Sequence, residues 1–438
     1  MYINNKGKKQ LYVRLNKALY GCMESAKLWY EMLVDTLVNK LNFVINAYDS
    51  CVANCMIDGH QCTICWYVDD LKISHINPEV VKNVIKQIES VYGKMTISTG
   101  TTHVYVGINI NYGNNQEAYI DMIDHVQEAI DDFPEKCSSK VNSPAGAHLF
   151  EINDHATLIP ESDRKIFHKI VSKLLFISNR ARPDIVVPIS FLTSRVTKAT
   201  TDDWKKLQRV LCYLQNTITM KLTISIDNTS VVKTWVDASY ACHHDMRSHT
   251  GGTILMGKGV LYTRSTKQKL NTKSSTEAEL VGASDFLSQT MWTKRFLEAQ
   301  GYNVSKNEFF QDNMSAMHME ENGRSSAGQK SRHINIRYFF IKDRIESGDI
   351  LLIHCPTDRM IADFFTKPLQ GKLFFKFRDV IMGVTHHQSL DQPTLPTQIC
   401  DHIPTTKSAH KIPKVVLVPK KNKSVLKTVH FCEKLTYN

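Results

Sequence analysis

Four acidic residues in the second half of the chain stand where strand or helix patterns begin or end. Asp237 closes the strand pattern of "VVKTWVDASY", and Asp312 closes that of "NEFFQDNMSAMHM". Glu277 lies in the first turn of the helix pattern in "KSSTEAELVGASDF", and Asp363 lies in a helical segment that Pro368 ends. Each position alone is explained by a turn, a helix cap or a solvated helix face. Brought together, carboxylates are the ligands that hard divalent cations prefer.

The helix pattern in "KSSTEAEL" contains two glutamates that fit the same structural role. Ser274 with Glu277, and Thr276 with Glu279, both have the spacing of a capping box. One helix start needs one such pair, so one glutamate is spare. The spacing alone does not say which one.

A second acidic feature is the pair Asp69 and Asp70 in "CTICWYVDDLKI". Neighbouring residues on a strand point to opposite faces, so a paired aspartate fits best in the tight turn of a β-hairpin. The aspartates ahead of this pair are Asp35 in a helix pattern and Asp49 and Asp58 in predicted turns. We therefore expect a hairpin that carries two carboxylates near its tip.

Four cysteines beside this hairpin suggest a competing kind of site. Cys51, Cys55, Cys62 and Cys65 have the number and close spacing of zinc ligands. However, "IDGH" between them is a hairpin turn signal, and alternation along the two strands then separates Cys65 from Cys62. Core cysteines of a hairpin are the interpretation that we favour over a zinc site.

The composition bounds the classes of protein that can position these residues. The chain has 438 residues, 42% hydrophobic and 22% charged, which is typical of two or three globular domains. Its apolar runs are shorter than the roughly 20 residues of a membrane span, and "MYINNKGKKQ" lacks a signal-peptide core. The 11 cysteines, an odd number, suit a reducing compartment. The net charge of +11 favours a nucleic-acid partner, although a solvated basic surface also explains it.

The pattern of elements divides the chain into blocks. Helix and strand patterns alternate up to about residue 110, and a helix is predicted over "YIDMIDHVQEAIDDF". Residues 161–218 are predicted to be helical, and the α/β alternation of one compact domain follows from 221 to about 370. The end of the chain has five prolines and many lysines, so we expect a flexible basic tail. The predicted domains are 1–112, 113–224, 225–375 and 376–438.

The ordered motifs resemble one family. "RSHTGG", "STKQK", "SSTEAEL", "DNMSA", "RHINIRYFFIKDRI" and "ADFFTKPL" resemble the ribonuclease H domain that ends the Pol polyprotein of copia-type LTR retrotransposons. "LNKALYG", "KLWYEML", "WYVDDLKI" and "VYVGINI" resemble the matching reverse transcriptase, and "RPDIVVPISFLTSRV" resembles the joining segment. The resemblance covers roughly residues 10–375 and implies a multidomain α/β and α+β protein. A truncated reverse-transcriptase palm would precede a ribonuclease H-like mixed-sheet domain.

The resemblance implies roles for the acidic residues of the second half. Asp237, Glu277, Asp312 and Asp363 would hold two Mg²⁺ ions, or Mn²⁺, roughly 3.5 to 4 Å apart and cut the RNA strand of an RNA·DNA hybrid. Nucleic-acid contacts are expected from the basic residues and histidine of two family motifs, Lys267, Lys269, Arg332 and His333. A mobile histidine that some relatives carry before the last aspartate corresponds weakly to His354, because "LLIHC" is a strand pattern.

The resemblance also implies that Asp69 and Asp70 would hold catalytic metal ions of a polymerase. That site needs a third carboxylate, which the family places on a neighbouring strand ahead of "LNKALYG", and no residue of the chain matches it. The stretch "YGCMESAKLW" departs from the commoner family version at Glu24 and Ala26.

We therefore expect ribonuclease H activity with polymerase activity lost. The alternative is an inactive remnant that binds nucleic acid. Localisation and oligomeric state stay open.

Overall fold

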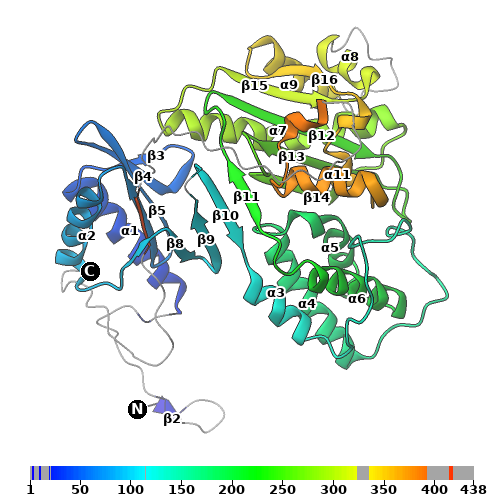
Figure 1. Cartoon of the computed structure of the whole chain (residues 1–438), viewed down its shortest axis with the longest axis horizontal. Helices are drawn as coiled ribbons and strands as arrows, with labels where there is room; N and C mark the ends of the chain where they lie inside the picture. The colour runs from blue at the N-terminus through cyan, green and yellow to red at the C-terminus, as the bar shows by residue number, and fades with distance from the viewer. Residues whose placement is uncertain are drawn as a thin grey trace, which may run out of the picture. The chain divides into compact units, whose positions relative to one another are not determined.

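The structure of the chain is a computed structural model. It describes residues 2–3, 9–10, 19, 21–113, 115–322, 335–391 and 414–417. The chain forms two compact units, of which the first comprises residues 1–106 and 409–438 and the second residues 107–408 (Figure 1). Helices and sheets occur in both units, so the expected multidomain mixture of helix and sheet is confirmed. In the described part of the chain, no helix is both long and apolar enough to cross a membrane.

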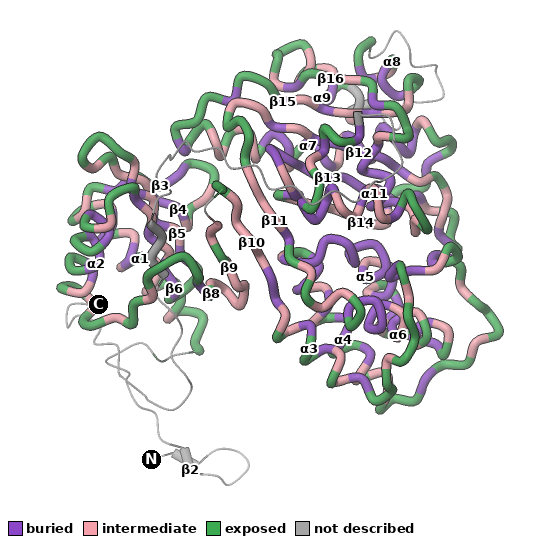
Figure 2. Tube along the Cα trace, in the orientation of Figure 1, coloured by how far each residue is buried: buried purple, intermediate pink, exposed green. Residues whose placement is uncertain are grey.

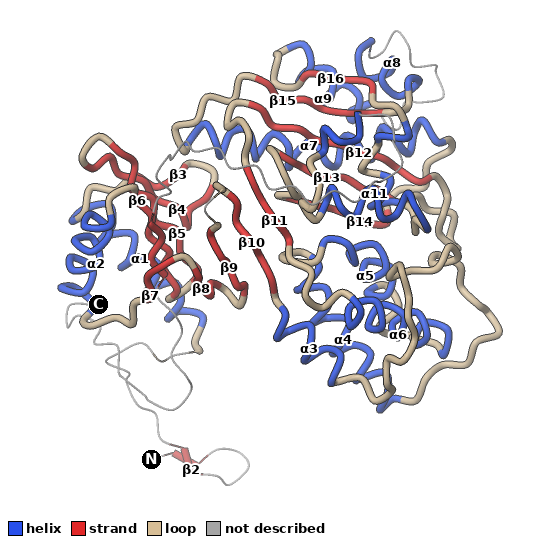
Figure 3. The backbone as a smooth tube through the Cα atoms, in the orientation of Figure 1, coloured by secondary structure: helices blue, strands red, loops and turns tan. Residues whose placement is uncertain are grey.

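Unit 1 is built around one sheet with the strand order β3-β4-β5-β6-β17-β7. Figure 3 shows its strands β3 to β7 in red and the helices α1 and α2 beside them in blue. Two hairpins with two-residue loops join β4 to β5 and β5 to β6, and Asp58 and Gly59 both adopt the left-handed backbone that the first loop needs. The helices and strands of this unit are β1 (Tyr2–Ile3), β2 (Lys9–Gln10), α1 (Met23–Asp35), a π-helix (Thr36–Lys40), β3 (Val44–Asn46), β4 (Asp49–Ile57), β5 (His60–Tyr67), β6 (Asp70–His75), α2 (Pro78–Tyr92), β7 (Ser98–Gly100), β8 (Thr102–Tyr105) and β17 (Lys414–Leu417).

The core of unit 1 forms where helix α2 and the strands share buried apolar residues. Ile64 of β5, Ile73 of β6 and Val81 of α2 are all fully buried in one cluster. Cys62 is buried in the same cluster, opposite Cys55 on the neighbouring strand. Cys62 is therefore a core residue, and Cys51 and Cys55 pack against the same cluster. In the described residues the four cysteines are not gathered into a metal-ligand group.

Unit 2 begins with a small sheet and a helical layer. Helix α6 begins with a complete capping box, in which the Thr200 hydroxyl accepts a hydrogen bond from the Asp203 backbone and the Asp203 carboxylate accepts one from Thr200. The elements are β9 (Ile108–Tyr112), β10 (Glu117–Asp121), α3 (Ile123–Asp131), α4 (Glu161–Ser178), α5 (Val186–Thr193), α6 (Thr201–Asn216) and β11 (Leu222–Ser225). Buried positions line the inner faces of α4, α5 and α6 (Figure 2).

The rest of unit 2 is a five-stranded mixed sheet with the order β14-β13-β12-β15-β16. Strands β12, β13 and β14 are antiparallel neighbours, whereas β15 and β16 run parallel to β12. The elements are β12 (Val231–Ser239), β13 (His249–Leu255), β14 (Tyr262–Lys267), α7 (Ser275–Ala299), β15 (Lys306–Gln311), α8 (Met314–Asn322), α9 (Asn335–Glu346), β16 (Leu351–His354), α10 (Asp363–Thr366) and α11 (Gly371–Ile381).

Several boundaries differ from the sequence-based prediction. The helix predicted over 119–133 begins only at Ile123, because residues 117–121 pair as strand β10 between β9 and β11. The predicted boundary after residue 224 falls inside β11, and the one after 375 falls inside α11. The segment expected as a tail thus starts within a helix whose Phe377 is fully buried.

Candidate active site

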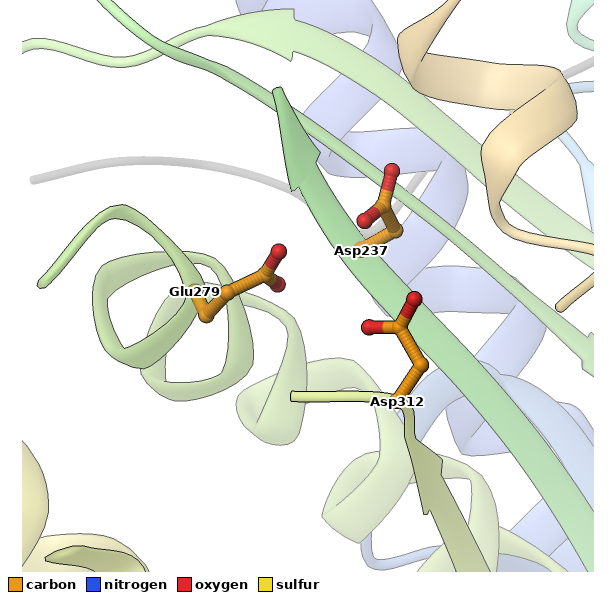
Figure 4. Close-up of side chains that lie close together, drawn as sticks. All are labelled: Asp237, Glu279 and Asp312. Atoms are coloured by element: carbon orange, nitrogen blue, oxygen red, sulfur yellow. The ribbon is translucent and has the colours of Figure 1, made fainter. Parts of the chain in front are cut away.

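Three carboxylates of unit 2 converge at one end of the mixed sheet. Asp237 lies near the end of β12, Glu279 lies on the second turn of α7, and Asp312 directly follows β15. One oxygen of each carboxylate lies within 4.8 Å of the others. The three side chains point toward one another from three separate elements (Figure 4). Among the described residues, this is the one group of three or more potential metal ligands.

The position of Asp237 and Asp312 follows from the sheet. Strands β12 and β15 are parallel neighbours, with Trp235 opposite Phe310. Their carboxyl ends therefore lie side by side, and the residue at each end projects into the same space. Asp237 is 2% exposed, and the Thr357 hydroxyl donates a hydrogen bond of 3.3 Å to Asp312.

The start of helix α7 separates the two candidate glutamates. Ser274 caps the helix by accepting a hydrogen bond from the Glu277 backbone, and the Glu277 carboxylate accepts one of 2.8 Å from the backbone N–H of Lys273. Glu277 therefore completes the helix cap. Glu279 faces β12, is 5% exposed, and has one oxygen, Oε2, without a hydrogen-bond partner. The structure places Glu279, rather than the predicted Glu277, beside the two aspartates.

Asp363 adjoins the group from a fourth element. It begins the short helix α10, and the Lys367 ammonium lies 2.7 Å from its Oδ1 and 3.5 Å from Asp237 Oδ2. Thr366, also on α10, donates a hydrogen bond to Asp237. Helix α10 therefore holds Asp237 through the Thr366 hydroxyl and brings a further carboxylate next to it, and the ammonium of Lys367, directly after the helix, adds a second contact.

Two glycines let α10 and α7 approach the sheet this closely. Gly251 is opposite Asp237 on β13, and a Cβ atom there would lie 2.7 Å from the backbone carbon of Phe365. A Cβ atom on Gly252 would lie 2.5 Å from the ring of Phe286 on α7. Real Cβ contacts essentially never come this close, so both faces of β13 are packed against backbone or ring atoms. The "GG" of the sequence motif thus positions both helices.

The raised pKa values of the group show that its negative charges are not fully compensated. Burial, with the nearby Asp237 and Asp312 adding to it, raises the pKa of Glu279 well above its ordinary value. Burial and Asp237 likewise raise the pKa of Asp363 to about 7 and raise that of Asp312. Crowded, buried carboxylates favour a shared proton or a bound cation. The all-oxygen donor set and the unpartnered Glu279 oxygen fit a divalent cation such as Mg²⁺.

The predicted nucleic-acid residues lie partly in one pocket. Lys267 and Lys269 line a pocket of about 790 Å³ together with Arg264 and Arg337. Gln268 also lines it and is 3% exposed, and its Oε1 has no hydrogen-bond partner. Lys267 in addition pairs with Asp245 at 2.5 Å. Arg332 and His333 lie outside the described residues.

His354 ends strand β16, as its sequence pattern predicts. Its register partner on β15 is Gln311, the residue directly before Asp312. The structure thus brings this histidine to the same end of the sheet as the carboxylates, with an exposed side chain.

The second acidic feature, in unit 1, is a hairpin tip as predicted. Val68 and Asp69 form the two-residue loop between β5 and β6, and Tyr67 pairs with Asp70. Asp69 is exposed and Asp70 is buried. Val68 has φ +56°, a costly conformation for a β-branched residue, and its carbonyl accepts a hydrogen bond from the Trp29 indole. No third acidic residue of the described part joins this pair into a metal-ligand group.

Comparisons with known proteins find similarity over most of the chain. Residues 2–144 match the family model of reverse transcriptase (RNA-dependent DNA polymerase). The chain is 22% identical over 86% of its length to the Retrovirus-related Pol polyprotein from transposon TNT 1-94 of Nicotiana tabacum. It is 26% identical over 87% of its length to the corresponding polyprotein from transposon RE1 of Arabidopsis thaliana. No solved structure matches the chain significantly.

The matches differ in how much of each relative they cover. They span 28% of the TNT 1-94 polyprotein and 25% of the RE1 polyprotein. A putative transposon Ty5-1 protein of Saccharomyces cerevisiae is 26% identical over 65% of this chain and 91% of its own length. The expected resemblance to Pol polyproteins of copia-type LTR retrotransposons is thereby confirmed, with a reverse-transcriptase match over the first third of the chain.

Proposed function

We propose that unit 2 is a ribonuclease H-like nuclease that cuts the RNA strand of an RNA·DNA hybrid with divalent metal ions. The observation that carries the proposal is the convergence of Asp237, Glu279 and Asp312 from β12, α7 and the end of β15. The strand order, the flanking α7 and Asp363 at the start of α10 support the same assignment. Polymerase chemistry belongs to the family that residues 2–144 match, and we propose that this chain does not perform it.

Each residue of the carboxylate group and its surroundings would have a distinct role. Asp237, Glu279 and Asp312 would hold the metal, with Asp363 next to Asp237 as a further ligand. Bound Mg²⁺ would supply an activated water and stabilise the leaving 3′ oxygen. Thr366 and Lys367 orient Asp237, while Lys267, Lys269 and Arg264 are placed to contact phosphates of the hybrid. Glu277 keeps the helix start in place.

A matched pair of glutamate variants tests the assignment. The measurement is cleavage of a labelled RNA·DNA hybrid by the full chain in Mg²⁺, with single-stranded RNA as the negative substrate. Glu279→Gln is expected to lower cleavage by about 100-fold or more, because it removes a ligand charge from the buried group. Glu277→Gln is expected to keep most cleavage and to cost about 1 kcal/mol of stability through the weakened cap.

A second readout separates metal binding from turnover. Mn²⁺ titration, followed by electron paramagnetic resonance, should show weaker binding in Glu279→Gln and unchanged binding in Glu277→Gln. The reverse order of the two variants would contradict the assignment of Glu279. Ca²⁺ should bind without supporting cleavage, because its longer oxygen distances misplace the attacking water.

One observation favours the alternative of an inactive nucleic-acid-binding protein. Lys367 already pairs with both Asp363 and Asp237, so an ammonium partly neutralises the group. If the wild-type chain binds hybrid but cuts no more RNA than the Asp237→Asn and Glu279→Gln variants, this alternative replaces the nuclease.

A further inference from the structure

Helix α2 joins two strands of unit 1 that are parallel but do not touch. Strand β6 precedes α2, β7 follows it, and both run antiparallel to β17, which lies between them. This is a split β-α-β arrangement, in which the two parallel strands leave room for one strand of opposite direction. The occupant of that position is not local in sequence: it comes from residues 414–417, more than 300 positions after β7.

The backbone register shows how β17 fits this position. On one side Lys414 pairs with His75 and Leu417 with Lys72, and on the other side Val415 pairs with Gly100. The two strands that β17 joins would otherwise each present an edge of unpaired N–H and C=O groups. Strand β6 matters most, because it begins at Asp70 and contributes the buried Leu71 and Ile73 to the core of the unit.

The sequence of this segment is suited to adding a single short strand. Val415 and Val416 are strand formers, and β17 lies between Pro413 and Pro419 in "IPKVVLVPKK". Proline has no N–H to donate, so a ladder that includes β17 cannot extend far beyond it at either end. Such a segment can complete a sheet without forming a long edge of its own.

We propose that residues 414–417 are an intramolecular donor strand and that the space between β6 and β7 is the strand-acceptor site that they fill. The end of the chain is then a structural part of unit 1. The acceptor site recognises an extended peptide through its backbone, as in β-strand addition. This inference does not depend on the proposed nuclease, because β17 belongs to unit 1 and the carboxylate group to unit 2.

Hydrogen exchange of the full chain tests the pairing. In the Val416→Pro variant, the amides of residues 72–75 and 98–100 should lose protection by about tenfold or more, because proline removes a donor from the middle of β17. Val425→Pro is the matched control, since it makes the same change in the same end of the chain outside β17. Amides of β12 and β13 in unit 2 serve as the internal reference. Unchanged protection of β6 and β7 in Val416→Pro would overturn the proposal.

Complementation in trans tests the acceptor site directly. A chain that ends at residue 408 should have unprotected β6 and β7 amides, and a peptide of residues 411–421 should restore their protection. The same peptide with Val416→Pro should not. If the peptide fails to restore protection, the acceptor site does not exist as proposed. If the wild-type chain shows protection only in a dimer fraction on size exclusion, the donor is a second copy and the intramolecular assignment is wrong.

Discussion

At the scale of single residues, the two glutamates of α7 show what sequence spacing cannot decide. Both fit a capping box, yet residues two positions apart on a helix point about 200° apart, so only one can face the sheet. The small residue Gly282, one helical turn after Glu279, indicates which face of the helix packs against the sheet. A Cβ on Gly282 would lie 3.3 Å from Ala238 of β12, and Glu279 shares that helix face through its i, i+3 spacing.

A pair of buried histidines gives a pH prediction at the same scale. His249 forms a hydrogen bond of 3.0 Å with His243 and one of 2.7 Å with Ser265. The Phe150 ring packs against both imidazole rings. Burial, with Lys267 nearby, lowers the pKa of His243 to about 4, and burial with His243 lowers that of His249 to about 3.

The sign of the effect follows from these directions. Below pH about 6.5 the unfolded chain protonates both histidines while the folded chain does not, so acid favours unfolding. We expect these two histidines to lower the free energy of unfolding of unit 2 between pH 7 and pH 4.5, by up to about 1.4 kcal/mol per pH unit for each histidine. The buried carboxylates with raised pKa, such as Asp363, contribute with the opposite sign, so the comparison of variants isolates the histidine contribution. In urea titrations, acid should destabilise His249→Gln less than wild type. His155→Gln, the same substitution at an exposed position, is the control, and equal effects of acid on all three proteins would contradict the prediction.

At the scale of elements, the sequence predicts those hairpins and helices whose signals lie within the element itself. The two hairpins follow from "DG" and "VDD" between strand formers, and the helices α2, α4 and α6 follow from their apolar periodicity. Strand β10 was missed because its residues pair with β9 and β11, and β11 lies about 100 positions away. Apolar residues of "AYID" fit either structure until that partner is known.

Helix α10 provides the element-scale prediction. It has only four residues, so its position depends on packing against β13 at Gly251 rather than on its own hydrogen bonds. Gly251→Ala is expected to destabilise unit 2 by about 1–3 kcal/mol, because the new Cβ would overlap Phe365 and Thr366. It should also lower hybrid cleavage, because α10 carries Asp363 and the hydroxyl that holds Asp237.

The matched control for this variant is Gly146→Ala. A Cβ there meets nothing within 4 Å, and its φ is not in the left-handed region, so thermal unfolding should change little. A Gly251→Ala protein that melts and cleaves like wild type would show that α10 is not held by this contact.

At the scale of the whole molecule, the length of the chain predicts two or three globular domains, and the structure has two compact units. The predicted boundary near residue 112 lies close to the observed division after Val106. The end of the chain could not be assigned from its pattern. Four strand residues between prolines carry no period of their own, and their partners at 72–75 and 98–100 are set only by the folded sheet.

The arrangement of unit 1 leads to the last prediction, which concerns polymerase chemistry. A two-metal polymerase site needs more carboxylate ligands than the exposed Asp69 and the buried Asp70 can supply. The family resemblance places the third on a strand beside the hairpin. In this structure the strand along the outer edge of β6 is β17, whose residues are Lys414, Val415, Val416 and Leu417, none of them acidic.

We therefore expect the full chain to show no primer extension on an RNA template in Mg²⁺ or Mn²⁺, under conditions in which the same preparation cuts the RNA of a hybrid. Removing the end of the chain at residue 408 should not restore extension, since that frees the edge of β6 without adding a carboxylate. Extension by the wild-type chain that Asp70→Asn abolishes would show that the aspartate pair recruits a ligand from elsewhere, and would refute the assignment of polymerase inactivity. Asp58→Asn, in the other hairpin loop of unit 1, is the control that should leave any such activity unchanged.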